Sequence, residues 1–291
     1  MLDFIINPCA GGGHRRKKSK LAVKIIETKL KNTGVDFAFH FTEYPKHAVS
    51  IAKDLIEKGA TDIIVVGGDG TLHEVLNGFS DFDRVNLGII PCGTGNDFAN
   101  AIGVPEDPEK ALDIVLTHKP QYTDFMQMPT VRGLNIIGMG IDVDVLRLYE
   151  KVRKKTRLSY TLCLIKTLFN FKYSEFDVET ENAKESYRSM IAAVANGYRY
   201  GGGIAICPVA SPTDNKLDFV AVKEMKKIKM IGAFLKLKKG KILTVPETVH
   251  FNAKNVKITP KGSYTVNVDG QLYDDIPFEI KIVSDTLKMY R

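Results

Sequence analysis

Hydrophobic positions in the first 124 residues follow two patterns, which are short continuous apolar runs and longer stretches with helical spacing. The apolar runs occupy residues 2–7, 36–42, 62–66 and 85–90, as expected of buried strands in a parallel sheet. Helical spacing marks residues 20–30 and 47–58, and Gly59 then stands where a helix C-cap favours glycine. Because strands and helices alternate and glycine-rich turns follow the strands, we predict a doubly wound α/β domain with its site at the strand ends.

The pattern changes near residue 121, from where short alternating runs bounded by turn residues predict strands. These runs are residues 134–138, 176–179, 188–195, 216–222, 256–259, 263–268, 278–282 and 286–290. Helices are expected at residues 144–172 and 226–237. The fold class is therefore α/β plus all-β. We place an α/β domain at residues 1–124 and a β-rich, sandwich-like domain at residues 125–291.

One stretch of the first domain combines a buried strand, a glycine-rich turn and the start of a helix. The run Asp62-Ile-Ile-Val-Val ends at Gly67-Gly68-Asp69-Gly70-Thr71, and a helical pattern begins at Leu72. Glycines let a backbone approach a ligand closely, and a helix N-terminus offers unpaired N–H groups to phosphate. A carboxylate at Asp69 would repel phosphate unless Mg²⁺ lies between them. An ordinary strand–helix turn is the alternative.

The net charge of +7 is unevenly distributed. Residues 1–124 hold 14 Lys and Arg against 17 Asp and Glu, whereas residues 125–291 hold 27 against 17. The excess gathers at residues 151–157 and among the lysines between Lys223 and Lys241, in both cases beside apolar residues. Such a composition is typical of surfaces that contact anionic lipid headgroups, although a plain solvated face would share it. No motif favours nucleic acid.

Composition also limits the location of the protein. No apolar run approaches the ~18 residues of a membrane span, and residues 1–7 are too short for a signal peptide. Four scattered cysteines show neither a metal-binding spacing nor a disulfide framework. We therefore expect a reducing, cytoplasmic location.

Five motifs together resemble the bacterial soluble lipid kinases of the diacylglycerol kinase catalytic-domain family. The central Gly67–Thr71 turn looks like the nucleotide motif that this family shares with sphingosine kinases, NAD kinases and phosphofructokinases. The others are Asn-Pro-Cys-Ala-Gly at residues 7–11, Pro-Cys-Gly-Thr-Gly-Asn-Asp-Phe-Ala at 91–99, Gly-Gly-Gly at 201–203 with its continuation to Asp218, and Val-Asp-Gly at 268–270. They run almost end to end in the family's order.

The resemblance implies an ATP site, and small residues and hydroxyls in it suit backbone amides that cradle phosphates. The implied nucleotide-binding residues are Asn7, Pro8, Ala10, Gly11, Thr42, Gly67, Gly68, Asp69, Gly70, Thr71, Leu72, His73 and Thr94. Asp69 and Asp97 resemble the carboxylates that organise Mg²⁺ and the phosphoryl centre. Thr42 alone could instead be a strand-end cap, and Asn96-Asp97 a helix N-cap pair.

The loop at residues 211–216 resembles the family's structural magnesium loop, with ligands expected from Ser211, Asp214 and Lys216, the outer two through carbonyls. Asn215 replaces the family's usual glycine and tolerates a left-handed backbone less well. An Asx-turn without metal is the alternative.

The sequence departs from the family at Gln271, where a glutamate is the proposed proton acceptor. A glutamine amide is not a base near neutral pH. Three options remain open: Asp269 acts as base, Asp69 acts as base, or the enzyme is weak or inactive. Because phosphoryl transfer depends more on positioning and electrostatics than on a strong base, we favour activity and keep Asp69, Asp97, Asp269 and Gln271 as catalytic candidates.

The sequence thus predicts an ATP- and Mg²⁺-dependent lipid kinase with its active site in the cleft between the domains, peripheral at the inner membrane face. It would phosphorylate a primary hydroxyl of a lipid such as diacylglycerol. The alternatives are an NAD kinase-like enzyme with a soluble substrate and a catalytically weak nucleotide- or lipid-binding protein. The identity of the lipid and the oligomeric state stay open, with a homodimer as one option.

Overall fold

A computed structural model describes residues 1–11, 16–31, 33–153, 156–168 and 170–291, which form two compact units. Unit 1 comprises Met1–Thr123 and Ser284–Arg291, and unit 2 comprises Asp124–Val283. The chain passes between the units within β5 (Gln121–Gln127) and again within β15 (Glu279–Met289). The sequence placed the last residues in the second domain, whereas the end of β15 pairs with a strand of unit 1.

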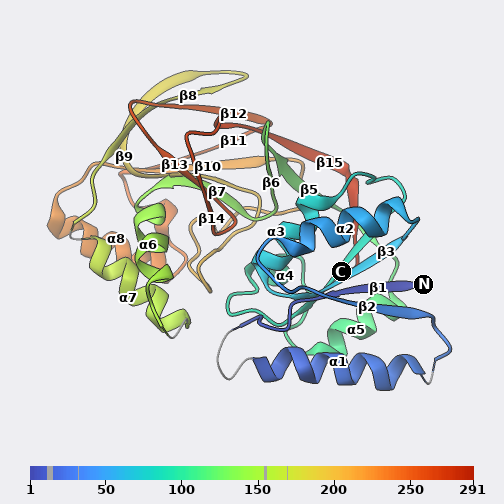
Figure 1. Cartoon of the computed structure of the whole chain (residues 1–291). Coiled ribbons are helices and arrows are strands. Elements are labelled where there is room, and N and C mark those ends of the chain that lie inside the picture. The colour runs from blue at the N-terminus through green and yellow to red at the C-terminus, as the bar shows by residue number, and fades with distance from the viewer. Residues whose placement is uncertain (12–15, 32, 154–155, 169) are drawn as a thin grey trace. The chain divides into compact units, whose positions relative to one another are not determined.

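A parallel sheet forms the centre of unit 1 (Figure 1). Its strands are β1 (Leu2–Ile6), β2 (Phe37–Phe41), β3 (Asp62–Gly67) and β4 (Asn86–Pro91), in the order β2–β1–β3–β4. The end of β15 adds to β4 in parallel, with Lys288 opposite Asn86. β1 and β3 are buried on both faces, as their continuous apolar runs predict. The doubly wound α/β prediction is confirmed.

Helices cover both faces of this sheet (Figure 1). They are α1 (Arg16–Lys31), α2 (His47–Glu57), α3 (Asp69–Gly78), α4 (Asp97–Ala101) and α5 (Pro108–Thr117). α2 packs against α3 on one face, and α1 packs against α5 on the other. Because the order of the strands reverses between β1 and β3, the loops after these two strands flank the crevice in which open α/β sheets bind ligands.

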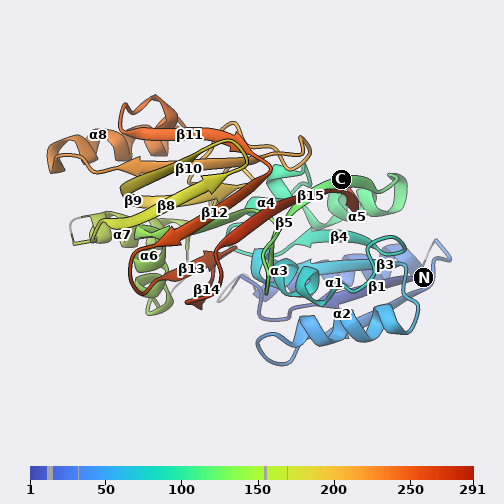
Figure 2. The ribbon, with the colours of Figure 1, turned by 90° about the horizontal axis from the view of Figure 1, so that it is seen from above.

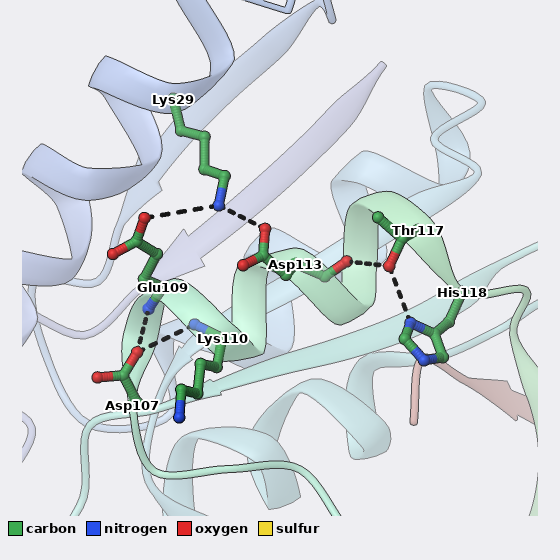
Figure 3. A network of polar contacts seen from close by, with 7 residues as sticks. All are labelled: Lys29, Asp107, Glu109, Lys110, Asp113, Thr117 and His118. Atoms are coloured by element: carbon green, nitrogen blue, oxygen red, sulfur yellow. Dashed lines mark hydrogen bonds and ion pairs between the residues drawn. The ribbon is translucent and has the colours of Figure 1, made fainter.

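Polar contacts hold α1 to α5 (Figure 3). Lys29 of α1 forms ion pairs with Asp113 and Glu109 of α5, and the hydrogen bond to Asp113 raises the pKa of Lys29. Asp107 caps the N-terminus of α5 by accepting hydrogen bonds from the backbone N–H groups of Glu109 at 3.1 Å and Lys110 at 3.0 Å. The ion pairs are partly exposed, so we expect them to contribute at most about 1 kcal/mol each.

Antiparallel strands build unit 2 (Figure 2). They are the end of β5, then β6 (Arg132–Gly133), β7 (Ile136–Gly140), β8 (Ser174–Thr180), β9 (Lys184–Ala195), β10 (Leu217–Lys223), β11 (Thr248–Ala253), β12 (Asn255–Pro260), β13 (Thr265–Val268), β14 (Gln271–Asp274) and the start of β15. The main path runs β14–β13–β7–β9–β8–β12–β15, and β10 joins β9 to β11. The β-rich prediction is confirmed.

The described residues of unit 2 also form the helices α6 (Ile141–Glu150), α7 (Arg157–Leu168) and α8 (Lys227–Lys238), and the 3₁₀ turn η2 (Ile242–Thr244). Two apolar clusters lie on the two faces of β10. One includes Val220 together with residues of α6, α7 and α8, and the other includes Phe219 together with Phe176. β10 is therefore buried on both faces, as an interior strand should be.

The single helix that we predicted at residues 144–172 is wrong in its extent, because the structure has two helices there. α6 ends at Glu150, and α7 begins at Arg157. The sequence between them is the basic run at residues 151–155, which interrupts the apolar repeat and brings like charges together. Residues 154 and 155 lie outside the described part of the chain.

Candidate functional site

The loops after β1 and β3 are joined directly at the point where the strand order reverses. Asn7 follows β1, and its side-chain amide donates a hydrogen bond to the Thr71 hydroxyl, at 3.0 Å, in the first turn of α3. The carbonyl of Asn7 accepts from the Ser19 hydroxyl at 2.9 Å, and its side-chain oxygen accepts from the N–H of Cys9 at 2.9 Å. Asn7 thus links the turn after β1 to the N-terminus of α3, and the N-terminal end of a helix dipole attracts anions.

The loops after β3 and β4 approach each other at two glycines. A Cβ atom on Gly93 would lie 2.6 Å from the Cα of Gly68, and one on Gly68 would lie 2.8 Å from the Cα of Gly93. The Asn96 side chain accepts from the N–H of Gly93 at 2.8 Å, which closes the second loop. Glycine is needed at both positions because backbone would meet any side chain there.

Two carboxylates converge beside these loops. The Asp69 oxygens accept hydrogen bonds from the backbone N–H groups of Asp97 at 3.2 Å and Phe98 at 3.1 Å, at the start of α4. A Cβ atom on Gly95 would lie 2.9 Å from an Asp97 carboxylate oxygen and 3.1 Å from an Asp69 oxygen, so both face the same glycine. Neighbouring hard oxygen ligands of this kind fit Mg²⁺.

The remaining residues predicted to bind nucleotide differ in accessibility. The N–H of Thr42, just after β2, donates to the carbonyl of Ile6 at 2.9 Å, which places Thr42 beside the end of β1. Gly11 has a φ of 78°, which favours glycine. Leu72 and His73 are 0% and 2% exposed, so their side chains belong to the core of unit 1. Gly12 and Gly13, which follow the motif at residues 7–11, lie outside the described residues.

The predicted metal loop lies in unit 2, beside a carboxylate of β5 that sequence reasoning missed. Asp124 is 4% exposed and accepts a hydrogen bond from the backbone N–H of Asn215 at 2.7 Å. Burial and the charges of Asp218 and Asp124 raise the pKa of Asp214. Asn215 has a φ of 56°, the left-handed conformation that the family's glycine implies. No local pattern marks Asp124, because Gln121, Thr123 and Gln127 of the same strand are also polar.

The Asp269 carboxylate fastens one turn of unit 2 to another. Its oxygens accept hydrogen bonds from the backbone N–H groups of Leu134 at 2.6 Å, Asn135 at 2.9 Å and Ile136 at 3.1 Å. This arrangement favours a structural role for Asp269 over a role as base. Gln271 begins β14, and its side-chain oxygen accepts from the Tyr273 hydroxyl at 3.3 Å.

The candidate binding residues form two groups, one in each unit. In unit 1, glycine loops, a helix N-terminus and two carboxylates lie together, an arrangement that could hold a phosphorylated ligand and a hard cation. In unit 2, Asp124 and the loop at residues 211–216 could offer oxygen ligands to a cation. Comparison with known proteins places the chain in a family.

Residues 2–128 match the diacylglycerol kinase catalytic domain, and residues 135–291 match the YegS C-terminal NAD kinase beta sandwich-like domain. The chain belongs to the lipid kinase family that these two domains define. YtlR of Bacillus subtilis (strain 168), assigned to the lipid kinases, is 28% identical over 95% of each chain. The diacylglycerol kinase of Mycobacterium tuberculosis (strain CDC 1551 / Oshkosh) is 28% identical over 99% of this chain and 94% of its own length.

Solved structures agree with the fold. A crystal structure from Bacillus anthracis str. Sterne, of a protein assigned to the diacylglycerol kinases, has a TM-score of 0.82 at 25% identity and covers 99% of this chain and 96% of its own. An Archaeoglobus fulgidus NAD kinase in complex with ATP has a TM-score of 0.53 at 17% identity, covering 100% and 94%, which shows a shared fold alone.

Proposed function

We propose that this protein transfers the γ-phosphoryl group of ATP, with Mg²⁺, to a primary hydroxyl of a lipid such as diacylglycerol. The observation that carries the proposal is the match of both domains, over almost the whole chain, to a family whose members include proteins named diacylglycerol kinase. The carboxylates and glycine loops of unit 1 support it, since phosphoryl transfer depends on positioning and on neutralising phosphate charge.

In this proposal the loops of unit 1 hold the triphosphate. The backbone N–H groups at the start of α3 face the phosphates, and Asn7 keeps the loop after β1 in register with Thr71. Asp69 and Asp97 would hold Mg²⁺, which when bound would neutralise charge on the transferred group. Asp69 also fixes the start of α4 through two hydrogen bonds, so cation binding and loop geometry depend on one side chain.

The proton acceptor in this proposal is Asp69 rather than Asp269. Three backbone N–H groups occupy the Asp269 oxygens, against two on Asp69, and Gln271 has no basic form near neutral pH. Ser211, Asp214 and Lys216 would hold a second, structural Mg²⁺, and the buried Asp124 beside them adds negative charge that favours a cation there.

We also propose that unit 2 contacts anionic membranes through the outer faces of α7 and α8. In α8, Ile228, Ile231 and Leu235 are 75%, 52% and 54% exposed, while Met230 and Ala233 face the core. In α7, Leu158, Leu162 and Ile165 form a matching exposed row. Both helices lie at the same end of unit 2 in Figures 1 and 2. Apolar rows pointing away from the core are typical of helices that lie in a lipid interface.

Charge supports the same assignment. The lysines in and beside α8 in the sequence are exposed: Lys223, Lys226, Lys227, Lys229, Lys236, Lys238, Lys239 and Lys241. Near an anionic surface each lysine contributes about 1 kcal/mol. No helix among the described residues is long and apolar enough to cross a membrane. The proposed contact is therefore peripheral.

The proposed reaction is tested by incubating the purified protein with γ-labelled ATP and diacylglycerol in mixed micelles, with and without Mg²⁺. We expect labelled phosphatidic acid that depends on Mg²⁺. A folded protein that binds ATP and labels no lipid would contradict the proposal and favour the nucleotide-binding alternative.

A further inference from the structure

Cys207, Asp218 and His250 come together in unit 2 from three separate segments. Cys207 precedes the loop at residues 211–216, Asp218 lies on β10, and His250 lies on the neighbouring strand β11. One sulfur, one carboxylate oxygen and one imidazole nitrogen from these residues all lie within 4.8 Å of one another. Cys207 and Asp218 are 0% and 2% exposed, so the chain places these groups in its interior.

Groups near Cys207 act on its thiol in opposite directions. Backbone hydrogen bonds from Val209 and Ala210 lower the pKa of Cys207 and so favour the thiolate. Burial and the negative charge of Asp218 act against the thiolate, and together they raise the pKa of Cys207 to about 12. A cation between sulfur and carboxylate would remove this conflict.

Asp218 is oriented by its neighbours on β11. One carboxylate oxygen accepts hydrogen bonds from His250 Nε2 and from the Asn252 side chain, both at 2.7 Å. In a metal site, Asn252 would keep its hydrogen bond and hold the carboxylate in place, which is the usual role of groups that surround metal ligands. His250 would exchange its hydrogen bond to Asp218 for a bond to the metal.

We propose that Cys207, Asp218 and His250 bind one divalent cation of the zinc type, with water as the fourth ligand. Sulfur, nitrogen and oxygen ligands in this combination favour Zn²⁺ over Mg²⁺, which takes oxygen ligands. Atoms that bind one tetrahedral zinc lie roughly 3.3–3.7 Å apart, so small side-chain movements from the present separations suffice. The Cys207 proton leaves to solvent when the metal binds.

The proposed zinc site can be reached from solvent, and its ligand atoms differ from those of the predicted magnesium loop. The His250 side chain is 26% exposed, so it connects the buried pair to solvent. The loop at residues 211–216, by contrast, would offer oxygen atoms alone, which suit Mg²⁺. The proposal does not depend on kinase activity.

Co²⁺ is the probe of choice because cobalt bound to a thiolate gives a charge-transfer band in the near ultraviolet. The full-length protein is freed of metal with a chelator and titrated with Co²⁺ under reducing conditions. We expect the band to saturate at one Co²⁺ per chain, to persist in excess Mg²⁺ and to disappear when Zn²⁺ is added. A protein that gives no stoichiometric band would overturn the proposal.

Variants identify the ligands. Cys207→Ser should abolish the band, and His250→Gln, at a partly exposed position, should weaken Co²⁺ binding tenfold or more. Cys163→Ser is the matched control, because it removes another buried thiol of unit 2 and should leave the band unchanged. Circular dichroism checks folding. If Cys207→Ser does not fold, unchanged Co²⁺ affinity in His250→Gln would still contradict the site, as would a band that survives in folded Cys207→Ser.

Discussion

At the scale of single residues, Asp69 has a chemical role and a structural role, which one substitution should affect to different degrees. It would hold Mg²⁺ and accept the proton in the proposed function, and it accepts the two hydrogen bonds that begin α4. We predict that Asp69→Asn lowers turnover roughly a hundredfold or more, because the cation loses a charged ligand. The asparagine side-chain oxygen still accepts a hydrogen bond, so the free energy of unfolding should fall by at most about 1–2 kcal/mol. Steady-state kinetics and thermal unfolding measure the two effects.

The matched control for this variant is Asp54→Asn, at an exposed position of α2. It should change neither turnover nor melting temperature appreciably. Turnover of Asp69→Asn within a factor of two of the unmodified protein would rule out the assigned role.

The second residue-scale prediction concerns Asp269 and Gln271. Asp269→Asn replaces an acceptor of three backbone N–H groups by a side chain with one acceptor, so we expect a loss of about 1–3 kcal/mol in stability. Gln271→Glu should change the rate by less than about tenfold in either direction, because proton abstraction is a small part of the barrier. Chemical denaturation and kinetics test the two variants.

Asp285→Asn is the control for Asp269→Asn, because Asp285 has a similar left-handed backbone, with a φ of 54° against 51°, but is exposed. It should be neutral. If Asp269→Asn kept full stability and lost its activity, Asp269 would be the better candidate for the base. A hundredfold gain in Gln271→Glu would mean that the natural glutamine limits the rate.

The third residue-scale prediction concerns pH. Asp142 is buried on α6, and burial raises the pKa of its carboxyl from an ordinary 3.8 to about 6, although Asn267 donates a hydrogen bond to it at 2.9 Å. Because the pKa of Asp142 is higher in the folded state, its protonated carboxyl contributes to folding stability. This contribution is complete below the unfolded pKa and is lost as pH rises through about 6. Asp142→Asn should therefore stabilise the protein at pH 8, by at most about 3 kcal/mol, and give no gain near pH 4. Equal effects at both pH values would contradict this account.

Some of these residues could be predicted from the sequence and others could not. Asp69 and Asp97 follow recognisable strands and glycines, so local pattern indicates them. Asp124 was missed because its partner, the N–H of Asn215, is far along the chain. The arrangement of Asp269 on three N–H groups of residues 134–136 and the meeting of Cys207 with His250 also depend on tertiary contacts, which residue spacing does not encode.

At the scale of elements, α8 should act as a membrane contact. Replacing Ile231 and Leu235 together with Gln removes the centre of the exposed row without touching the buried Met230. We predict weaker sedimentation with anionic vesicles and an unchanged melting temperature, because these side chains gain from burial only at an interface.

Reversing the charge of lysines in the run from Lys223 to Lys241 should weaken vesicle binding by about 1 kcal/mol for each lysine. Added salt should also weaken vesicle binding, because it screens the same charges.

Leu21→Gln supplies the control for α8, since Leu21 is an equally exposed leucine on α1 of unit 1, at 52%. It should not affect vesicle binding. Activity toward a short-chain, water-soluble lipid should survive the α8 changes. Equal losses on soluble and membrane substrates would show that α8 serves the active site or the fold.

Elements were predicted well where the hydrophobic repeat was long and less well where it was interrupted. The strands of unit 1 follow directly from buried apolar runs, and α2 lies where its repeat indicated. The break between α6 and α7 was missed because apolar residues resume after the basic run with a similar spacing. The short strands β6 and β14 were also missed, since two to four residues carry too little pattern.

At the scale of the whole molecule, the two units match the two domains of one lipid kinase family, and the chain enters unit 1 again at its end. No local feature of residues 284–291 predicts that return, because it depends on the parallel pairing of β15 with β4. Family membership directs attention to a lipid hydroxyl as acceptor, and the soluble acceptor named as an alternative in the sequence analysis is the competing outcome.

The most direct test of this account is the transfer of labelled phosphate from ATP to a panel of acceptors in the presence of Mg²⁺. The panel comprises diacylglycerol, monoacylglycerol, phosphatidylglycerol, ceramide and sphingosine in mixed micelles, with NAD as the soluble comparison. We predict that at least one lipid is labelled, that NAD is not, and that Asp69→Asn loses the signal. Label on NAD alone, or on no acceptor with folded protein and bound ATP, would contradict the central claim.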